Sequence, residues 1–489
     1  MSAAEKNAQI NSDNNLAKEG GKCATLIKNA TLVNADSTSH VDILIEDGKI
    51  AEIAPSIFRP DAEQIDAFGK YVMPGGIDAH THFNIDVGLA QSCDDFESGT
   101  IAAACGGTTT IIDHMGFGPE GCNLHHQLAR YHAFAADKAV VDYSFHGVIQ
   151  HVDDSILDEM ESMVLQEGIS SFKLYLTYKH KLNDGEVLRV LERLGQLDAL
   201  ACVHPENDQA ISWLQQKYIS QGNTGPIYHA LSRPPECEAE AIARMINLAA
   251  IAGNAPLYIV HLSNGPGLDY IRLSQQEGQP VFAETCPQYL TLDIGRYNEP
   301  EMGGLKYIMS PPLRDMDHQN SLWQGLQDGS ISTVATDHCS FTFEQKLSGR
   351  NDFRMCPGGA PGVETRMPLM FSEGVMKGKL GINRFVDITS TRPAKLFGLY
   401  PRKGVVREGA DADLVIFDPD RCVRITQRHL HGNSDYSPFE GMEVRGWPVL
   451  TMVRGQIVAK DGQFVGAPGY GEFLKRSGLP EEYHFFQTA

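Results

Sequence analysis

The sequence contains no long apolar run, no export signal and no paired cysteine motif. No stretch of its 489 residues approaches the roughly 20 consecutive apolar residues that a membrane-spanning helix needs, so we expect no membrane partner. Residues 1–22 are rich in Ala, Asn, Ser, Glu and Lys, and they lack the apolar core of a signal peptide. We interpret residues 1–23 as a disordered N-terminal tail.

Cysteine pairs and positive charge are also scarce. The ten cysteines are scattered, without a single CxxC pair. A chain of this size needs no disulfides, so we predict a cytoplasmic protein with reduced thiols, most of them packed in its core. The 41 Lys and Arg residues stand against 62 Asp and Glu, which gives a formal net charge of -21. An acidic surface argues against nucleic acid and anionic membranes as partners.

Strand patterns are present at both ends of the chain. Residues alternate between apolar and polar in Thr25–Val33 and Val41–Ile53, the second of which is interrupted by a turn at Asp47–Gly48. Similar short strands are predicted at Ala412–Phe417 and Val449–Val453, with a turn at Arg454–Gly455. Two β-rich ends that flank one long middle indicate a small β-sandwich-like domain built from both termini.

The middle of the chain alternates between short apolar runs and segments of helical period. The eight runs are Ile77–His82, Thr108–His114, Val141–Ile149, Phe172–Thr177, Ala201–His204, Leu257–Leu262, Val281–Cys286 and Ser332–His338. Helices are predicted between them, for example at Leu124–Lys138, Ile156–Gln166 and Cys237–Ala252. Strands that alternate with helices pair in parallel, and eight such units predict an α/β fold, the (β/α)8 TIM barrel.

These patterns divide the chain into five parts. We predict a disordered tail at 1–23, the first part of the β domain at 24–73, a catalytic barrel at 74–400, the second part of the β domain at 401–462, and a C-terminal tail at 463–489. The last part contains Phe473, Leu474, Phe485 and Phe486. Such apolar side chains predict that this tail either packs on a neighbouring subunit or folds back on its own chain.

Ionisable residues stand where the predicted strands end. His80 and His82 close the first run in the tripeptide HTH, and residues i and i+2 of a strand point to the same side, so both imidazoles can bind one ion. His204, His261 and Asp337 end three other runs, in VHPEN, YIVHLSN and VATDH. Side chains at these strand ends build the active site of a (β/α)8 barrel.

Lys173 lies inside SSFKLYLTY, among apolar neighbours. A bare ammonium is costly to bury, whereas a neutral amine can react with carbon dioxide to form a carbamate, which is a carboxylate that could bridge two cations. Each residue of the set also has an ordinary structural interpretation: a hydrogen-bonded histidine, a helix N-cap for Asp337, or a buried ion pair for Lys173.

Taken together, the six residues predict a metal site. Nitrogen and oxygen ligands without sulfur suit zinc, manganese, iron or nickel. Six protein ligands are too many for one catalytic metal that keeps an open position, and they fit two metals about 3.5–4 Å apart.

The motifs resemble those of the dihydropyrimidinase and hydantoinase branch of the amidohydrolase superfamily. They are HTH at 80–82, FKLYLTY at 172–178, HPEN at 204–207, HLSN at 261–264, SPPLR at 310–314 and ATDH at 335–338, within a similarity that runs from about residue 24 to 465. The phrases HFNIDVG and GGTTTIIDHMGFGP resemble those of bacterial D-phenylhydantoinase-like proteins most nearly.

The resemblance implies a role for each of the six candidate ligands. It implies two divalent metals, expected to be zinc, with His80, His82 and Asp337 on one and His204 and His261 on the other. Lys173 would be carbamylated by carbon dioxide to N6-carboxylysine and would bridge both metals. The resemblance also implies a homotetramer.

The resemblance further implies catalytic and substrate-binding residues. Tyr178 would stabilise the developing oxyanion, Asp337 would transfer the proton, and Ser310 would bind the substrate ring through its backbone. Gly358 stands where the family carries an Asn with similar backbone contacts, so any contribution of the Asn side chain is absent here.

The implied reaction is the hydrolysis of a cyclic amide. A metal-bridging hydroxide would attack the ring amide of a hydantoin, a 5-substituted hydantoin or a dihydropyrimidine, and the ring would open to an N-carbamoyl amino acid. The apolar residues Phe83, Ile85, Val87, Leu89, Met115 and Phe117 follow the first two strands. They predict either an apolar pocket for a ring substituent or simple loop packing.

Three alternatives remain open. A dihydroorotase would carry an Arg at position 84, where this chain has Asn84. An allantoinase often has Asn there, although Ile85, Asp86 and Val87 depart from the acidic-Pro-Gly run expected after it. A non-catalytic dihydropyrimidinase-related scaffold would lack the metal ligands, all six of which are present.

Overall fold

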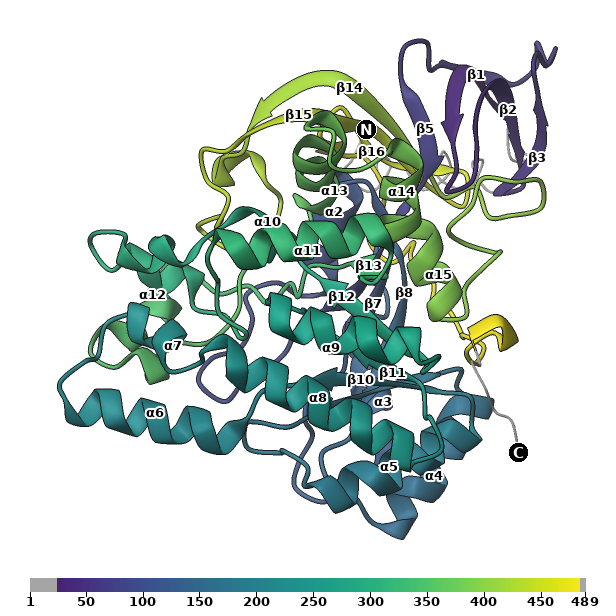
Figure 1. Cartoon of the computed structure of the whole chain (residues 1–489). Helices are drawn as coiled ribbons and strands as arrows, with labels where there is room; N and C mark the ends of the chain where they lie inside the picture. The colour runs from purple at the N-terminus through teal and green to yellow at the C-terminus, as the bar shows by residue number, and fades with distance from the viewer. Residues whose placement is uncertain (1–23, 484–489) are drawn as a thin grey trace, which may run out of the picture.

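The computed structural model describes residues 24–483, which form an eight-stranded parallel barrel and a separate mixed sheet (Figure 1). The predicted fold class, an α/β barrel with a β domain built from both chain ends, is confirmed. The tail predicted at residues 1–23 lies outside the described residues, as do residues 484–489 at the end of the predicted C-terminal tail.

The barrel strands follow one another around the sheet in chain order, and every neighbouring pair is parallel. They are β6 (Gly76–Thr81), β7 (Thr108–His114), β8 (Asp142–Val148), β9 (Ser171–Tyr175), β10 (Leu200–His204), β11 (Leu257–Ile259), β12 (Val281–Thr285) and β13 (Thr333–Val334). Each barrel strand overlaps one of the eight apolar runs predicted from the sequence. The last run is strand for only two residues, and its remainder is a loop.

Side chains close the barrel between its first and last strands. Thr336 donates its backbone N–H and its hydroxyl to the two carboxylate oxygens of Asp78, at 3.1 and 2.7 Å. Arg366 is fully buried and donates to the carbonyls of Ile77 and Val334, at 3.0 and 2.9 Å. These contacts tie the loop after β13 to β6 and so fix the segment that carries Asp337.

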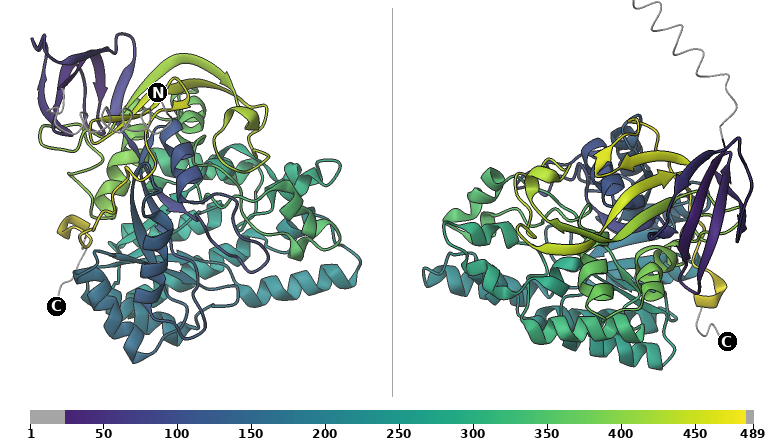
Figure 2. Two further views of the ribbon diagram at one scale, coloured as in Figure 1. Left: turned by 180° about the vertical axis from the view of Figure 1, so that it is seen from behind. Right: turned by 90° about the horizontal axis from the view of Figure 1, so that it is seen from above.

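Helices surround the barrel strands (Figures 1 and 2). The longer ones are α2 (Phe96–Cys105), α3 (Leu124–Ala135), α4 (Asp154–Leu165), α5 (Asp184–Gln196), α6 (Asp208–Ser220), α8 (Pro235–Ile251), α9 (Gly265–Gln276) and α11 (Met316–Asp328). Shorter ones are α7 (Ile227–Leu231), α10 (Pro287–Thr291), α12 (Phe343–Lys346), α13 (Arg366–Met370), α14 (Ile382–Val386) and α15 (Arg392–Leu396). The three helices predicted by residue range correspond to α3, α4 and α8.

Single turns of 3-10 or π-helix fill the longer connections. They are η1 (Ile294–Asn298), η2 (Gly303–Tyr307), η3 (Leu347–Arg350), η4 (Phe353–Met355), η5 (Phe371–Met376), η6 (Asp387–Thr391), η7 (Gln427–His429) and η8 (Glu481–Tyr483). Within residues 24–483, no helix is both long enough and apolar enough to cross a membrane.

The second sheet joins the two ends of the chain. Its strands are β1 (Thr25–Val33), β2 (Thr38–Glu46), β3 (Lys49–Ala54), β4 (Glu63–Asp66), β5 (Tyr71–Pro74), β14 (Leu414–Arg424), β15 (Glu443–Val453), β16 (Gln456–Lys460) and β17 (Gln463–Phe464). The N-terminal and C-terminal strands meet where β5 pairs antiparallel with β14, and Figure 2 shows the two groups side by side. β5 then leads into β6, so this sheet is attached directly to the first barrel strand.

Two hairpin turns of this sheet lie where the sequence predicts them. Asp47 and Gly48 have φ of 50° and 79°, and Arg454 and Gly455 have φ of 43° and 77°. Positive φ at both central residues matches the right-handed twist of the flanking strands, and Gly adopts it without strain.

The C-terminal segment folds back on its own barrel. Leu474 is fully buried, and its backbone N–H donates to the carbonyl of Tyr143 on β8 at 2.7 Å. The ring of Phe473 stacks on Phe145, with centroids 5.5 Å apart. Arg476 is buried and donates to the hydroxyl of Ser144 at 2.9 Å. Contact of this segment with another subunit stays a prediction.

Candidate active site

Five of the six predicted ligands lie at or just beyond the carboxyl ends of barrel strands, and the sixth, Lys173, lies within a strand. His80 and His82 stand on and just after β6, Lys173 on β9, and His204 at the end of β10. His261 follows β11 by two residues, and Asp337 follows β13 by three. The barrel therefore brings together residues that are separated by more than 250 positions in the sequence.

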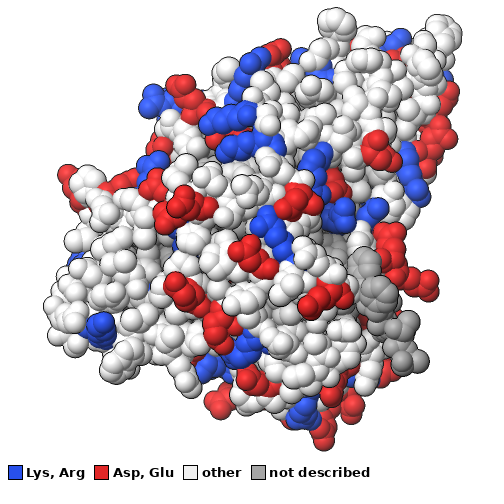
Figure 3. All heavy atoms as spheres, in the orientation of Figure 1, with Lys and Arg blue, Asp and Glu red and all other residues white. Residues whose placement is uncertain are grey.

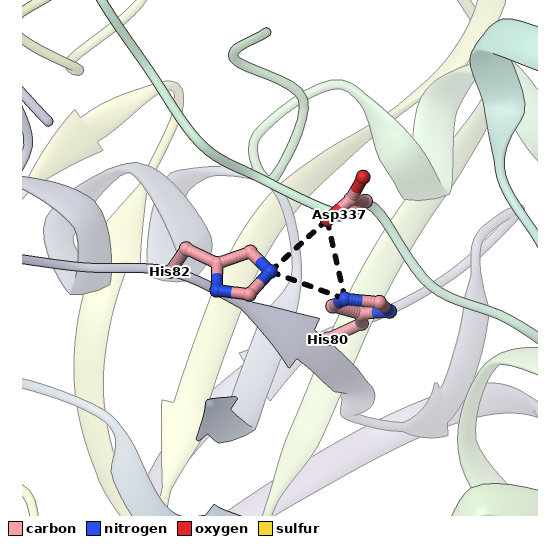
Figure 4. Close-up of side chains that lie close together, drawn as sticks. All are labelled: His80, His82 and Asp337. Atoms are coloured by element: carbon pink, nitrogen blue, oxygen red, sulfur yellow. Dashed lines mark hydrogen bonds and ion pairs between the residues drawn. The ribbon is translucent and has the colours of Figure 1, made fainter. Parts of the chain in front are cut away.

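His80, His82 and Asp337 converge on one point (Figure 4). Nε2 of each imidazole lies 3.1 Å from Oδ1 of Asp337, and the two Nε2 atoms lie 3.2 Å apart. A neutral imidazole carries one proton, so ring nitrogens that face one another and a carboxylate at this distance are arranged as ligands of a shared cation.

His204 and His261 form a second converging pair. Nδ1 of His204 lies 2.9 Å from Nε2 of His261, and the ring of His261 lies 5.5 Å from that of His80. Nε2 of His204 bonds to Glu206 at 2.7 Å, and Arg233 donates to the same carboxylate oxygen at 2.6 Å. This buried chain of contacts fixes the ring of His204 with Nδ1 toward His261.

Lys173 is buried at the centre of this arrangement. Its Nζ lies 3.4 Å from Nε2 of His80 and 5.5 Å from the centroid of the Tyr175 ring. Within residues 24–483, no carboxylate lies within ion-pair distance of Nζ, and Asp337 and Glu284 act on its charge from further away. Burial lowers the pKa of Lys173 to about 8, which increases the neutral fraction of the amine at physiological pH.

Burial and charge decide the protonation of the other ligands. Burial lowers the pKa of His82 to about 4, and burial together with His204 lowers the pKa of His261 well below its ordinary value. Burial alone would raise the pKa of Asp337, but the neighbouring histidines hold it well below its usual range. His80 differs, because Glu284 and Asp337 outweigh the effect of burial and raise its pKa.

Glu284, on β12, is a candidate functional residue that the sequence patterns missed. It is fully buried and accepts hydrogen bonds from Nδ1 of His80 at 2.6 Å and from the backbone N–H of His261 at 3.1 Å. A carboxylate behind a metal-ligating histidine orients the ring and raises its basicity. The one signal in the sequence is a Glu within the apolar run VFAET.

The asparagines of the HPEN and HLSN motifs have structural roles. Asn207 caps α6 by accepting the backbone N–H of Ala210 at 3.0 Å. Asn264 caps α9 by accepting the N–H of Gly267 at 2.7 Å. Each cap starts a helix within three residues of a candidate ligand and thereby fixes the end of the strand before it.

Three residues of the site have a left-handed backbone conformation. His261, Asp337 and Tyr178 have φ of 41°, 53° and 75°, in the left-handed region that residues other than Gly seldom adopt. Such conformations cost on the order of 1–3 kcal/mol each, and they persist where the surrounding structure holds them for a function.

Tyr178 and Ser310 lie together at the rim of this cluster. The ring of Tyr178 lies 5.1 Å from that of His204, and its hydroxyl bonds to the side chain of Ser310. The guanidinium of Arg233 lies 5.9 Å from the centre of the same ring. Gly358 is exposed in the loop after η4.

The apolar residues after the first two strands differ in their exposure. Phe83 and Met115 are fully buried in the core, and Ile85 packs against Phe341. These three residues therefore agree with the prediction of simple loop packing. Val87 and Leu89 are exposed. Phe117 is half-buried, and its ring lies 5.3 Å from that of Tyr175. The ring of Tyr175 in turn contacts that of Tyr178.

Comparisons with known proteins agree with this geometry. A model of the amidohydrolase family matches residues 71–268 and 311–458. A D-phenylhydantoinase of Escherichia coli is 59% identical over 453 residues, which are 92% of this chain and 98% of that protein.

Solved structures show the same likeness. A dihydropyrimidinase from Brevibacillus agri superimposes with a TM-score of 0.92 at 45% identity, over 94% of this chain and 100% of its own. An L-hydantoinase (dihydropyrimidinase) from Arthrobacter aurescens gives a TM-score of 0.84 at 34% identity, over 92% of this chain and 99% of its own.

Proposed function

The chain belongs to the amidohydrolase family, and we propose that it hydrolyses the ring amide of a cyclic ureide to give an N-carbamoyl amino acid. The candidate substrates are hydantoin, 5-substituted hydantoins and dihydropyrimidines. The observation that carries the proposal is the convergence of the histidines, Lys173 and Asp337 at the strand ends of one barrel. The names of the similar proteins support the choice of substrate class.

The donor set fits two divalent cations. His80, His82 and Asp337 would hold one, and His204 and His261 would hold the other. Lys173, carbamylated by carbon dioxide, would supply an oxygen to each. Nitrogen and oxygen donors of this kind suit zinc, which we propose as the metal. When bound, the two cations would lower the pKa of water and polarise the substrate carbonyl.

The side chains of this site would do the remaining chemistry. Asp337 is ionised at neutral pH, because the histidines around it hold its pKa low, so it can accept a proton from the attacking water. The same carboxyl would then give that proton to the leaving ring nitrogen. Tyr178 would donate its hydroxyl proton in a hydrogen bond to the carbonyl oxygen as negative charge develops there.

We assign the binding of the substrate ring to two segments, one around Ser310 and one around Gly358. We assign backbone contacts with the ureide ring to Ser310, whose side chain already bonds to Tyr178, and to the exposed Gly358. A Cβ at position 358 would meet no atom within 4 Å.

A neutral ring is favoured over a carboxylate substrate. Dihydroorotate carries a charge that must be paired with a cation when it is desolvated. Asn84 is uncharged, and its side-chain oxygen already accepts the backbone N–H of Phe96 at 3.2 Å. An allantoinase activity is the second candidate. Asn84 argues against dihydroorotate as the substrate, but allantoinases often carry Asn at this position, so allantoin is not excluded.

The deciding experiment is a panel of substrates. Metal-reconstituted protein should be assayed with hydantoin, 5-phenylhydantoin, dihydrouracil, allantoin and dihydroorotate, and kcat/KM measured for each. The proposal predicts turnover of the hydantoins and dihydrouracil and refusal of dihydroorotate. Turnover of dihydroorotate alone or of allantoin alone would replace the proposal with the corresponding alternative, and a protein that binds no metal and turns over none of them would be a scaffold.

We also propose a cytoplasmic homotetramer. Among residues 24–483, the cysteines are free and most are buried, as is usual for proteins of a reducing compartment. On the face drawn in Figure 3, positive and negative side chains are interspersed, without an extended basic patch that would favour nucleic acid. Light scattering coupled to size exclusion would measure the oligomeric state.

A further inference from the structure

Lys346, at the end of α12, places a fully buried ammonium among backbone carbonyls. Its Nζ donates to the carbonyl oxygens of Ile308, Pro357 and Gly359, at 2.8, 2.7 and 2.6 Å. An ammonium has three N–H donors and no acceptor, so these three oxygens satisfy it completely. These contacts offset the cost of burying the charge, for which residues 24–483 supply no carboxylate partner.

The three carbonyls belong to the two segments to which we assign ring binding. Ile308 precedes Ser310 by two residues, and Pro357 and Gly359 flank Gly358 on both sides. The backbone N–H of Gly359 also donates to the carbonyl of Ile308, at 3.0 Å. One ammonium therefore connects segments that are about 50 residues apart in the sequence.

The loop around Gly358 is shaped for this contact. Gly359 has φ of 140°, and a Cβ there would lie 2.5 Å from the carbonyl oxygen of Cys339. Only Gly tolerates this conformation and this close approach. With the carbonyls of Pro357 and Gly359 directed inward to Lys346, Gly358 is the exposed residue of the loop.

We propose that Lys346 is a positioning residue that sets the relative position of the Ser310 and Gly358 segments and thereby the affinity for the substrate ring. The proposal rests on the proposed function, which assigns ring binding to these two segments. Without the ammonium, three buried carbonyl oxygens would be unsatisfied and would repel one another, so both segments would shift. None of the metal ligands contacts Lys346, so the chemical step would be affected less than binding.

A matched control is available in Lys403, which is also fully buried. Its ammonium pairs with the carboxylates of Asp142 and Asp413, at 2.6 and 2.5 Å, rather than with the ring-binding segments. Lys346→Met and Lys403→Met each remove a buried ammonium at similar volume. Both should lower thermal stability, but only the first should affect substrate binding.

The test compares KM, kcat, metal content and hydrogen exchange in the intact metal-loaded protein. For Lys346→Met we expect KM for hydantoin to rise about tenfold or more, with kcat within about threefold of wild type and unchanged metal content. Amides of residues 308–314 and 357–360 should exchange faster in the same variant. Lys403→Met should leave KM and these two segments unchanged.

A second variant covers the case in which Lys346→Met fails to fold. Lys346→Gln keeps two N–H donors, so at least one carbonyl loses its partner, and KM and exchange should rise by a smaller amount. Unchanged KM and exchange in whichever variant folds would overturn the proposal, as would an equal rise in Lys403→Met. A wild-type protein that hydrolyses no cyclic ureide would refute the proposed function instead, while faster exchange in both segments would still show that Lys346 couples them.

Discussion

Nδ1 of His80 donates a hydrogen bond to Oε1 of Glu284 at 2.6 Å, and this contact turns Nε2 of the same ring toward Asp337. The second oxygen of Glu284 accepts the hydroxyl of Tyr258 at 2.9 Å, so the carboxylate itself is held in place. A residue that touches no substrate therefore determines how a candidate metal ligand is directed.

Replacement of this carboxylate should weaken metal binding. Glu284→Gln has the same shape but carries no charge, so we expect metal affinity to fall by about 10–100-fold, as for other carboxylates behind metal-ligating histidines. Competition with a chelator measures the affinity. Glu364→Gln is the control, because Glu364 is also buried but binds His431 rather than a candidate metal ligand. Equal affinity in the two variants would contradict this role of Glu284.

Lys173 should be essential for metal binding and activity, and Arg should not substitute for it. A carbamate needs a neutral amine, and a guanidinium stays protonated, so Lys173→Ala and Lys173→Arg should both lose metal and activity. Short carboxylic acids should restore part of each in Lys173→Ala, because they replace the missing carboxylate. Full activity in Lys173→Arg would exclude the carbamate.

Asp94 should make stability depend on acid pH. Burial would raise its pKa, but hydrogen bonds from His338, Asn433 and Ser340 outweigh burial, and the pKa falls from 3.8 to about 2. A depressed pKa contributes stability that is complete above about pH 4 and is lost as the pH falls toward 2; the size is about 2 kcal/mol. Asp94→Asn should therefore lower Tm at pH 7 and approach wild type as the pH falls below 4. A difference in Tm that is independent of pH would disprove the assignment.

Phe117 should contribute to the preference for substituted rings. Its ring is half-buried beside Tyr175, at the rim where a substituent would lie. We expect Phe117→Ala to lower the ratio of kcat/KM for 5-phenylhydantoin to that for hydantoin by about 10-fold, within the 1–3 kcal/mol that apolar pocket contacts provide. Phe58→Ala removes an exposed Phe of the β domain and should leave the ratio unchanged. If both variants keep the wild-type ratio, Phe117 only packs its loop.

Much of this site could be predicted because strand ends are local features of sequence. The HTH tripeptide, Lys173 and His204 are visible as polar residues that interrupt or end apolar runs, and the strands that carry them form as the runs predict. Asp337 was found by the same pattern, although it stands in a loop that Asp78 and Arg366 hold against β6. Its position therefore depends on distant contacts that the run itself does not show.

The residues that the patterns missed act through contacts between distant segments. Glu284 contacts His80, which lies 204 positions away in the sequence. Lys346, at the end of α12, contacts the carbonyls of Ile308 and Gly359 in two other loops. No periodicity or motif marks such residues, because a buried carboxylate or ammonium is defined by its partners. Glu206 lies within the HPEN motif, but its role depends on Arg233, which only the fold brings to it.

The central claim, that two metals held by this cluster hydrolyse a cyclic ureide, is tested most directly by titrating metal into chelated protein. Hydantoin hydrolysis should be measured at each addition of zinc in the presence of bicarbonate. We predict no activity without metal, and a rise that reaches its plateau at about two equivalents per chain. Full activity in chelated protein, or a plateau at one equivalent, would contradict the binuclear site.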